Sequence, residues 1–394
     1  MTGAQARRAL GIALGATIGA GLAVGIGLVG VSIAAARRLI VPPRKPTVEG
    51  HIVAIDEGTV TLTRGGTTDL PGRYGMWARE GAKGAGAYAK VGRIVGLTEH
   101  TVTRELETID EGELHIGDPV RLAAAYYRDP RELGVTVEDV LIRTPLGDAP
   151  AWLIPSVDST RDWAILVHGR DANRWEAIRA VPTLRGAGFT SLIISYRNDP
   201  GAPASPDRRY ALGDREWEDV EAAIEYALRA GARRIILMGW SMGGALVLQT
   251  SQRSRHREQI AGIILDSAVI DWRALILRNL DALGIREPIP TMSMRLVEHA
   301  IGSRLVGYSA PISLDRLDFV ANAHLLDVPV LVLFSRDDPT VPYRSAAQLA
   351  AACPDLVELE SFDVAGHVRI WNLWQERYES RIAEWLTRFT ADRA

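Results

Sequence analysis

Three side chains of the kinds that cooperate in nucleophilic catalysis each follow an apolar run of the chain. Ser241 lies in a Gly-x-Ser-x-Gly pattern at residues 239–243, Asp338 follows the run 328–334, and His367 follows the run 356–362. Serine alone is a weak nucleophile, and it reacts when a base takes its proton and an acid orients that base. The order serine, aspartate, histidine therefore indicates acyl transfer through a covalent intermediate.

The surroundings of Ser241 decide how its pentapeptide is interpreted. The apolar run 235–238 precedes it and the helix-compatible segment 244–249 follows at once. Gly239 and Gly243 suit a turn so tight that a Cβ atom would clash. The sequence therefore predicts a nucleophile elbow, with the hydroxyl held at the carboxyl edge of a sheet and above the start of a helix.

The elements that must position these side chains form an alternation of strands and helices from residue 135 to 394. A hairpin over 135–142 and 149–154 opens it, and amphipathic helices separate the later strands. Runs that are apolar along their whole length are typical of strands buried on both faces of a parallel sheet. The pattern predicts a doubly wound, mostly parallel α/β domain, with further strands at 163–167, 191–195, 235–238, 260–265, 328–334 and 356–362.

With these motifs in this order, residues 135–394 resemble the α/β-hydrolase-fold serine hydrolases, and most of all their lysophospholipase-like and acyl-peptidase-like branches. His168-Gly169-Arg170, after the third strand, resembles the His-Gly oxyanion motif of that family. The resemblance implies that the backbone N–H groups of Arg170 and Met242 face the developing oxyanion. It also implies that His168 packs beneath the oxyanion loop and that no cofactor is needed.

Two other carboxylates compete with Asp338 for the role of the acid. Asp337 is adjacent in sequence, and Asp266 follows the preceding strand, where this fold also places the acid. The sequence favours Asp338 over both. Three arginines near the oxyanion motif, which are Arg170, Arg174 and Arg179, could either steer an anionic substrate or serve as solvated or ion-paired side chains.

Composition excludes several other classes of function. The net charge is −3, which gives no reason to expect a nucleic-acid partner. Cys353 is the single cysteine, so an internal disulfide is impossible. The scattered histidines show no zinc-binding spacing, and we expect no metal and no cofactor.

Residues 9–36 carry no charge and are bracketed by arginine pairs, with a short tail at 1–8. A run of this length exceeds the roughly 20 residues that cross a bilayer core, and it predicts a single-pass membrane anchor. Glycines at four-residue spacing are typical of close helix contacts in membranes, so the chain could associate with itself through Gly11, Gly15 and Gly19.

Two alternatives remain for this segment. The small residues 34–36 would suit a signal-peptidase site, although the apolar run is long for a signal peptide. A buried soluble helix is disfavoured by the many glycines. The basic residues on the two flanks leave open the side of the membrane on which the catalytic domain lies.

Two further regions complete the predicted organisation. After a proline-rich linker at 37–47, residues 48–128 show short strand-like runs and predict a small β-rich domain, either a sandwich or a partly open barrel. Residues 272–310 hold two apolar helical segments broken near Pro288 and Pro290. They form either a cap over the site or an ordinary crossover.

Three functions follow from these elements. The first is a membrane-anchored esterase that acts on hydrophobic or lipid-like esters. The second is a serine peptidase of the acyl-peptidase or prolyl-oligopeptidase type, which the small size of the β-rich domain disfavours, because about eighty residues cannot build a propeller. The third is a catalytically silent scaffold, against which the intact Ser241, Asp338 and His367 argue.

Overall fold

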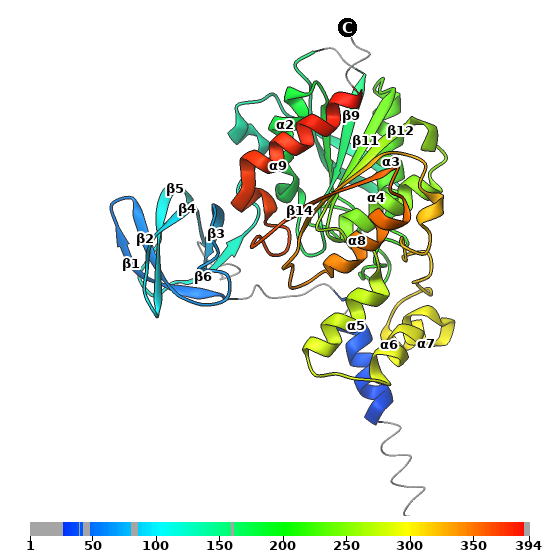
Figure 1. The fold of residues 1–394 in the computed structure, drawn as a ribbon, viewed down its shortest axis with the longest axis horizontal. Coiled ribbons are helices and arrows are strands. Elements are labelled where there is room, and N and C mark those ends of the chain that lie inside the picture. Colours follow the sequence, from blue (N-terminus) through cyan, green and yellow to red (C-terminus); the bar gives the residue numbers. More distant parts are fainter. Residues whose placement is uncertain (1–26, 39, 42–47, 80–85, 159–160, 390–394) are drawn as a thin grey trace, which may run out of the picture.

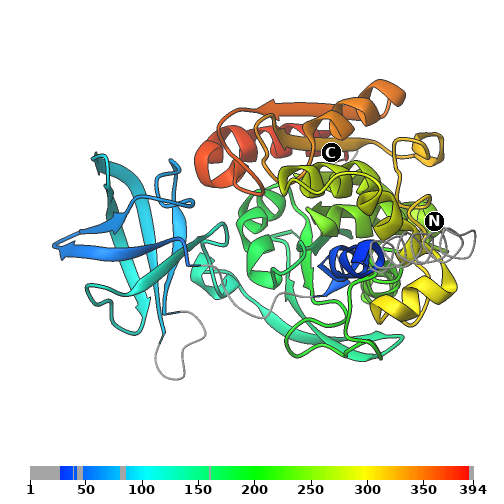
Figure 2. The same cartoon turned by 90° about the horizontal axis from the view of Figure 1, so that it is seen from below.

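The structure, a computed structural model, describes residues 27–38, 40–41, 48–79, 86–158 and 161–389. Within them, a helix over 27–38 is followed by a β-barrel and then by a larger α/β domain (Figure 1). Figure 2 shows the barrel set to one side of the α/β domain. The chain passes from one to the other between residues 123 and 138.

The barrel is closed, whereas the sequence predicted a sandwich or a partly open barrel. Pairing of Gly50 with Val120 joins its first and last strands. The two longest strands slip register at several points, and such bulges bend strands enough to close a sheet. The strand order is β1-β2-β5-β4-β3-β6, with β1 Gly50–Asp56, β2 Thr59–Thr63, β3 Tyr74–Ala78, β4 Ala87–Leu97, β5 Thr101–Glu111 and β6 Pro119–Ala123.

Strand β3 and the first half of β4 were not predicted because glycines and alanines are interspersed with their larger buried side chains, Tyr74, Met76 and Tyr88. Gly75 shows why the interspersed residues are small. A Cβ atom there would lie 2.2 Å from the Tyr88 hydroxyl and 2.5 Å from the Ala125 carbonyl oxygen. Small side chains give little hydrophobic contrast, so a period of two is hard to detect.

The α/β domain is built on an eight-stranded sheet in the order β14-β13-β12-β11-β9-β10-β8-β7. All neighbouring pairs from β14 to β10 are parallel, while β8 is antiparallel to both of its neighbours. The predicted doubly wound α/β class is therefore correct. The strands are β7 Glu138–Thr144, β8 Gly147–Ile154, β9 Asp162–Val167, β10 Thr190–Ile194, β11 Arg234–Trp240, β12 Ile260–Asp266, β13 Val330–Ser335 and β14 Val357–Phe362.

Helices cover both faces of this sheet, and each face has its own hydrophobic core. Helices α3 (Trp217–Arg229), α4 (Met242–Arg253) and α8 (Tyr343–Ala352) pack on one face. Helices α2 (Val181–Gly186) and α9 (Ile370–Leu386) pack on the other. Burial on both faces explains why the central strands read as unbroken apolar runs.

The segment after β12 folds into three helices that lie at one end of the molecule with the 27–38 helix (Figure 1). They are α5 (Trp272–Ala282), α6 (Ile289–Glu298) and α7 (Ala300–Val306). The predicted second helix is thus split in two near His299. Gly302 allows α7 to fold back on α6, because a Cβ atom there would lie 2.5 Å from the Leu296 carbonyl oxygen.

The predicted membrane anchor at 9–36 lies largely outside the described residues, as do Gly11, Gly15 and Gly19. Over the part of the chain that the structure describes, no helix combines the length and the apolar character needed to cross a bilayer. The described end of the segment, the 27–38 helix, buries Ser32, Ala35 and Ala36. Ala35 and Ala36 pack in the same core as α5 and α6, and the Ser32 carbonyl oxygen lies 3.1 Å from the Ser293 hydroxyl of α6.

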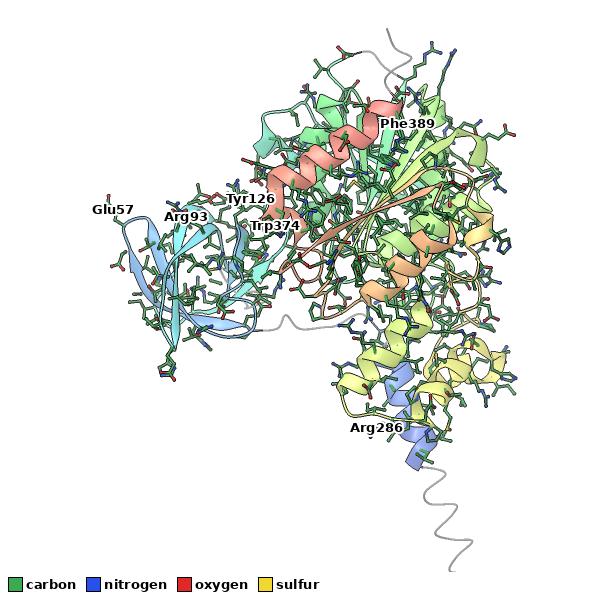
Figure 3. The ribbon with its side chains drawn as sticks, in the orientation of Figure 1. Glu57, Arg93, Tyr126, Arg286, Trp374 and Phe389 are labelled. Atoms are coloured by element: carbon green, nitrogen blue, oxygen red, sulfur yellow. The ribbon has the colours of Figure 1, made fainter. Side chains whose placement is uncertain are left out.

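The barrel contacts the α/β domain through the start of α9. The Asn372 side chain donates hydrogen bonds to the carbonyl oxygens of Arg73 (2.7 Å) and Ala124 (3.0 Å). The Arg73 guanidinium in turn donates to the Tyr126 hydroxyl at 2.6 Å. Tyr126 and Trp374 mark this junction in Figure 3. Because Asn372 is buried, these bonds replace water at the interface and fix the barrel beside the carboxyl edge of the sheet.

Candidate active site

Ser241 occupies the turn between β11 and α4 in a strained backbone conformation, with φ 49° and ψ −117°. The turn is as crowded as the pattern predicts. A Cβ atom at Gly239 would lie 2.4 Å from the Gly243 carbonyl oxygen, and one at Gly243 would lie 2.1 Å from the Val167 carbonyl oxygen. Side chains at either position would therefore force the turn open and move the Ser241 hydroxyl.

The structure brings the three predicted catalytic side chains together in one line. His367 Nε2 lies 3.0 Å from Ser241 Oγ, and His367 Nδ1 lies 2.8 Å from Asp338 Oδ2. Ser241 follows β11, Asp338 follows β13 and His367 follows β14. Parallel strands end at the same edge of the sheet, so side chains separated by 126 residues in sequence meet there.

Asp338 fixes the orientation of the imidazole. Its side chain is fully buried, and its Oδ1 accepts hydrogen bonds from the backbone N–H groups of Thr340 (2.8 Å) and Val341 (2.9 Å). The remaining oxygen accepts from His367 Nδ1, which leaves Nε2 unprotonated and facing the Ser241 hydroxyl. This is the tautomer that a general base requires.

The two competing carboxylates lie elsewhere. Asp337 is exposed and accepts a hydrogen bond from Ser335 Oγ. Asp266 is fully buried beneath the elbow, where it accepts from Ser267 Oγ (2.9 Å) and from the Tyr378 hydroxyl (3.0 Å). Burial raises the pKa of the Asp266 carboxyl, although the Arg179 guanidinium opposes the shift. Neither carboxylate is hydrogen-bonded to His367.

The predicted oxyanion loop packs directly against the nucleophile. A Cβ atom at Gly169 would lie 3.1 Å from Ser241 Cβ, and the Gly169 N–H donates to Glu176 Oε2 at 2.7 Å. Met242 is the first residue of α4, and the first four N–H groups of a helix have no partner within it. The catalytic role of the Arg170 and Met242 amides remains a prediction.

His168 lies beneath this loop and is completely buried. Its Nδ1 lies 2.9 Å from the Gly169 carbonyl oxygen and its Nε2 lies 2.8 Å from Asp199 Oδ2. Both partners accept, so both ring nitrogens carry protons. Burial alone would lower the pKa of His168, but the Asp199 charge and these hydrogen bonds outweigh it and raise the pKa.

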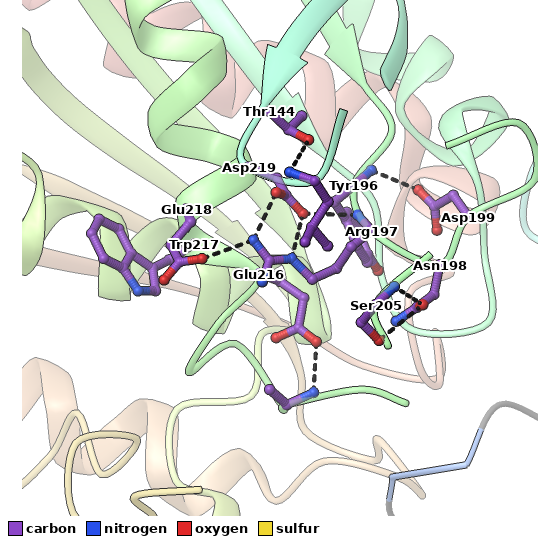
Figure 4. Close-up of polar contacts among 12 residues, drawn as sticks. Thr144, Tyr196, Arg197, Asn198, Asp199, Ser205, Glu216, Trp217, Glu218 and Asp219 are labelled. Atoms are coloured by element: carbon purple, nitrogen blue, oxygen red, sulfur yellow. Dashed lines mark hydrogen bonds and ion pairs between the residues drawn. The ribbon is translucent and has the colours of Figure 1, made fainter. Parts of the chain in front are cut away.

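Asp199 is the functional neighbour that the sequence pattern missed. Its carboxylate also accepts the Tyr196 N–H at 2.8 Å (Figure 4), and the Tyr196 hydroxyl donates to the Gly169 carbonyl oxygen at 2.9 Å. The sequence feature that could have identified Asp199 is its position shortly after strand β10, at the carboxyl edge of the sheet where the site lies. The oxyanion loop is therefore held from below by a buried ionic pair.

The three arginines near the motif have distinct surroundings. Arg174 lies over the Trp152 ring at 4.0 Å, and Arg179 is buried and donates to the Val368 carbonyl oxygen at 3.0 Å. Burial removes Arg179 from any contact with substrate. Arg170 donates to two backbone carbonyl oxygens of the N-terminal segment, at residues 38 and 41.

Two cavities meet at Ser241 and His367. The larger, about 1070 Å³, lies between the 27–38 helix and α5 and extends to Val341. The smaller, about 290 Å³, lies beside the barrel and is bounded by Trp77, Arg121 and residues 122–125. No sequence motif placed the barrel or the N-terminal helix at the catalytic site, but residues of both line the cavities beside Ser241.

The fold and the site together define a hydrolase of the α/β-hydrolase class. The sequence model of the Alpha/beta hydrolase family matches residues 164–385, and the chain belongs to that family. Residues 51–123, the barrel, match a family described as a domain of unknown function. No curated protein matches the chain.

Solved structures show the same fold. An esterase of Pyrococcus furiosus in one crystal form has a TM-score of 0.51 and 20% identity, over 66% of this chain and 94% of that one. A second crystal form of that esterase has a TM-score of 0.50 and 22% identity, over 66% of this chain and 96% of that one. A thermophilic esterase from Thermogutta terrifontis has a TM-score of 0.45 and 19% identity, over 64% of this chain and 98% of that one. The likeness to the two Pyrococcus furiosus crystal forms supports the fold of the larger domain.

We expect Asp338→Asn to lower kcat by roughly 10,000-fold, because an amide donating to Nδ1 would select the wrong tautomer of His367. The measurement is the hydrolysis of p-nitrophenyl acetate by the purified full chain. Asp337→Asn is the matched control and should keep wild-type activity. A larger loss from Asp266→Asn than from Asp338→Asn would show that the acid is wrongly assigned.

The His168–Asp199 pair predicts how stability varies with pH. The pKa of His168 is higher in the folded protein than its unfolded value of 6.5. The pair therefore contributes fully to the free energy of unfolding below pH 6.5, and this contribution is lost as the pH rises through the folded-state pKa. Urea unfolding should show that His168→Asn is most destabilising at pH 6 and less so at pH 9. The exposed His324→Asn serves as control. A destabilisation that is independent of pH would contradict the charged pair.

Proposed function

We propose that this protein is a serine esterase that cleaves carboxylic esters with an apolar acyl group. One observation carries the proposal: the line Asp338–His367–Ser241 ends at a hydroxyl that opens into a large cavity lined by Trp272, Leu275 and other apolar side chains. An apolar cavity next to a nucleophile favours a substrate whose acyl part is hydrophobic.

The reaction proceeds in two steps. Ser241 Oγ attacks the ester carbonyl carbon while His367 Nε2 takes its proton, and Asp338 stabilises the imidazolium that forms. The tetrahedral intermediate collapses as His367 protonates the departing alcohol. A water molecule, deprotonated by His367, then attacks the acyl-enzyme and releases the acid and free Ser241.

The backbone N–H groups of Arg170 and Met242 hold the negative charge that develops on the carbonyl oxygen. Removing one donor of such a pair typically costs about a hundred- to a thousandfold in rate. The buried His168–Asp199 pair beneath the loop supports this role, since its hydrogen bonds to Gly169 and Tyr196 restrict the loop before substrate arrives.

We also propose that residues 9–36 anchor the protein in a membrane, with helices α5, α6 and α7 at the bilayer surface. Exposed apolar side chains support this arrangement, because large apolar side chains on a surface are typical of contact with a partner or a bilayer. They occur on the 27–38 helix, on α5 and on α7, and are Val29, Val31, Leu277, Leu283, Ile301 and Leu305.

The buried residues of the 27–38 helix favour retention of this segment. Cleavage near residues 34–36 would remove Ala35 from the core that it shares with α5 and α6 and would remove the buried Ser32. The same cut would open the large cavity to solvent along one side. An uncleaved anchor keeps the cavity closed on that side and next to the source of a lipid-like substrate.

The catalytic proposal is tested by labelling the purified chain with a fluorophosphonate and then offering p-nitrophenyl esters and matched peptide amides. We expect stoichiometric labelling at Ser241 and ester turnover that exceeds amide turnover. Ser241→Ala is the control and should lose both. Equal labelling of that variant would end the enzyme proposal, and faster amide turnover would favour the peptidase.

The anchor is tested by extracting membranes from expressing cells with alkaline carbonate. We expect the full chain to stay in the membrane pellet, because a helix of about 20 apolar residues inserts almost irreversibly. Sequencing the amino terminus of the extracted protein is the companion measurement. Release into the supernatant, or a mature chain that begins near Arg37, would contradict the anchor.

A further inference from the structure

The large cavity beside Ser241 has walls from two distant parts of the sequence. Leu275 and Ile276 of α5 line one side, and Ala34 and Ala35 of the 27–38 helix line the other. The volume, about 1070 Å³, is at the upper end for sites that enclose small organic ligands. Alanines on the helix side leave this space open, since larger side chains there would occupy it.

Two polar contacts hold this helix, one near its middle and one just beyond its last residue. The Ser293 hydroxyl of α6 donates to the Ser32 carbonyl oxygen at 3.1 Å. Beyond the helix, the Tyr210 N–H donates to the Ile40 carbonyl oxygen at 2.9 Å. The wall is therefore part of the folded catalytic domain, although the whole barrel, from Gly50 to Ala123, separates it from that domain in sequence.

Arg170 links the wall to the catalytic loop. Its Nη2 donates to the carbonyl oxygens of Arg38 and Val41, each at 3.1 Å, and its guanidinium lies 5.6 Å from the centre of the Tyr210 ring. The same residue carries one of the two amides predicted to bind the oxyanion. A shift of the N-terminal segment would thus be transmitted to the loop through a single side chain.

We infer that residues 27–38 and 40–41 are the specificity element of the enzyme: they form the wall of the site for a long aliphatic acyl chain, and Arg170 is a positioning residue that couples this wall to the oxyanion loop. The inference rests on the proposed esterase function. It assigns substrate selection to a segment that lies outside the residues matched by the Alpha/beta hydrolase family.

The first test fills the cavity from the helix side. Ala34→Trp should lower kcat/KM for p-nitrophenyl decanoate about tenfold or more, because the indole occupies space that the acyl chain needs. Its kcat/KM for the acetate should change by no more than about twofold, as for an ordinary surface substitution. Val31→Trp, on the same helix but not in the cavity wall, should leave both substrates unaffected.

The outcomes separate this inference from the proposed function. Wild-type protein that neither takes the fluorophosphonate nor cleaves esters would overturn the esterase itself. An Ala34→Trp variant that labels at the wild-type rate but keeps its decanoate-to-acetate ratio would overturn the wall. A variant that loses labelling as well is replaced by Ala34→Leu, for which a smaller shift in the same ratio is expected.

The second test addresses the link through Arg170. Arg170→Met keeps the aliphatic stem and removes both hydrogen bonds, so kcat for the acetate should fall between about tenfold and a hundredfold with KM little changed. Arg170→Lys, which keeps one donor group, should recover part of the loss. Arg174→Met is the matched control and should retain kcat. An unchanged kcat in Arg170→Met, or a change in KM alone, would overturn the positioning role.

Discussion

Close packing around the turn at Ser241 is the constraint on which the rest of the structure depends. The serine has a positive φ, and glycines at 239, 243 and 244 touch backbone or side-chain atoms that leave no room for a Cβ. A Cβ at Gly244, for example, would lie 2.3 Å from Ala268 Cβ. The strain of such a turn persists only where its surroundings hold it. The Ser241 N–H donates to the Asp266 carbonyl oxygen and the Ser241 carbonyl oxygen accepts the Val269 N–H, so strand β12 and the residues just after it supply that support.

Charge is distributed around this turn in two layers. At the sheet edge, His367 and Asp338 face the nucleophile, and the imidazole keeps about a fifth of its side-chain surface exposed. Below and beside it, the charged groups of Asp266, Arg179, His168 and Asp199 are buried. Buried charges are tolerated where hydrogen bonds or an opposite charge compensate them. His168 pairs with Asp199 at 2.8 Å, and Arg179 lies 3.9 Å from Asp266, although its Nε and Nη2 have no hydrogen-bond partner among the described residues. The hydrogen bonds of these buried groups limit the movement of the groups above them, as the proposed reaction requires.

The parts of the chain that precede the catalytic domain divide the space around Ser241. The barrel borders a small cavity that contains polar groups such as Arg121. The N-terminal helix and α5 border a larger cavity that is lined mainly by apolar residues, with Arg37 and Arg38 also in its lining. An ester has an acyl part and an alcohol part, and each of the two cavities could hold one of them. The stacking of Trp77 on Trp175, with centroids 5.8 Å apart, connects the barrel to the segment just after the oxyanion loop. The barrel is therefore a neighbour of the site and not a separate appendage.

The sequence by itself determined the α/β class, the elbow at Ser241 and the choice of His367 and Asp338 as its partners, because each lies in a short motif directly after a buried strand. These signals are local, and parallel strands bring them to one edge whatever the details of packing. It did not determine that the barrel closes, because closure depends on pairing between residues far apart in sequence, such as Gly50 with Val120. Nor did it indicate that Asp199 supports His168 or that Ala34 and Ala35 line a cavity with α5. Those relations join residues far apart in sequence through side-chain packing and hydrogen bonds, and only the tertiary structure decides them.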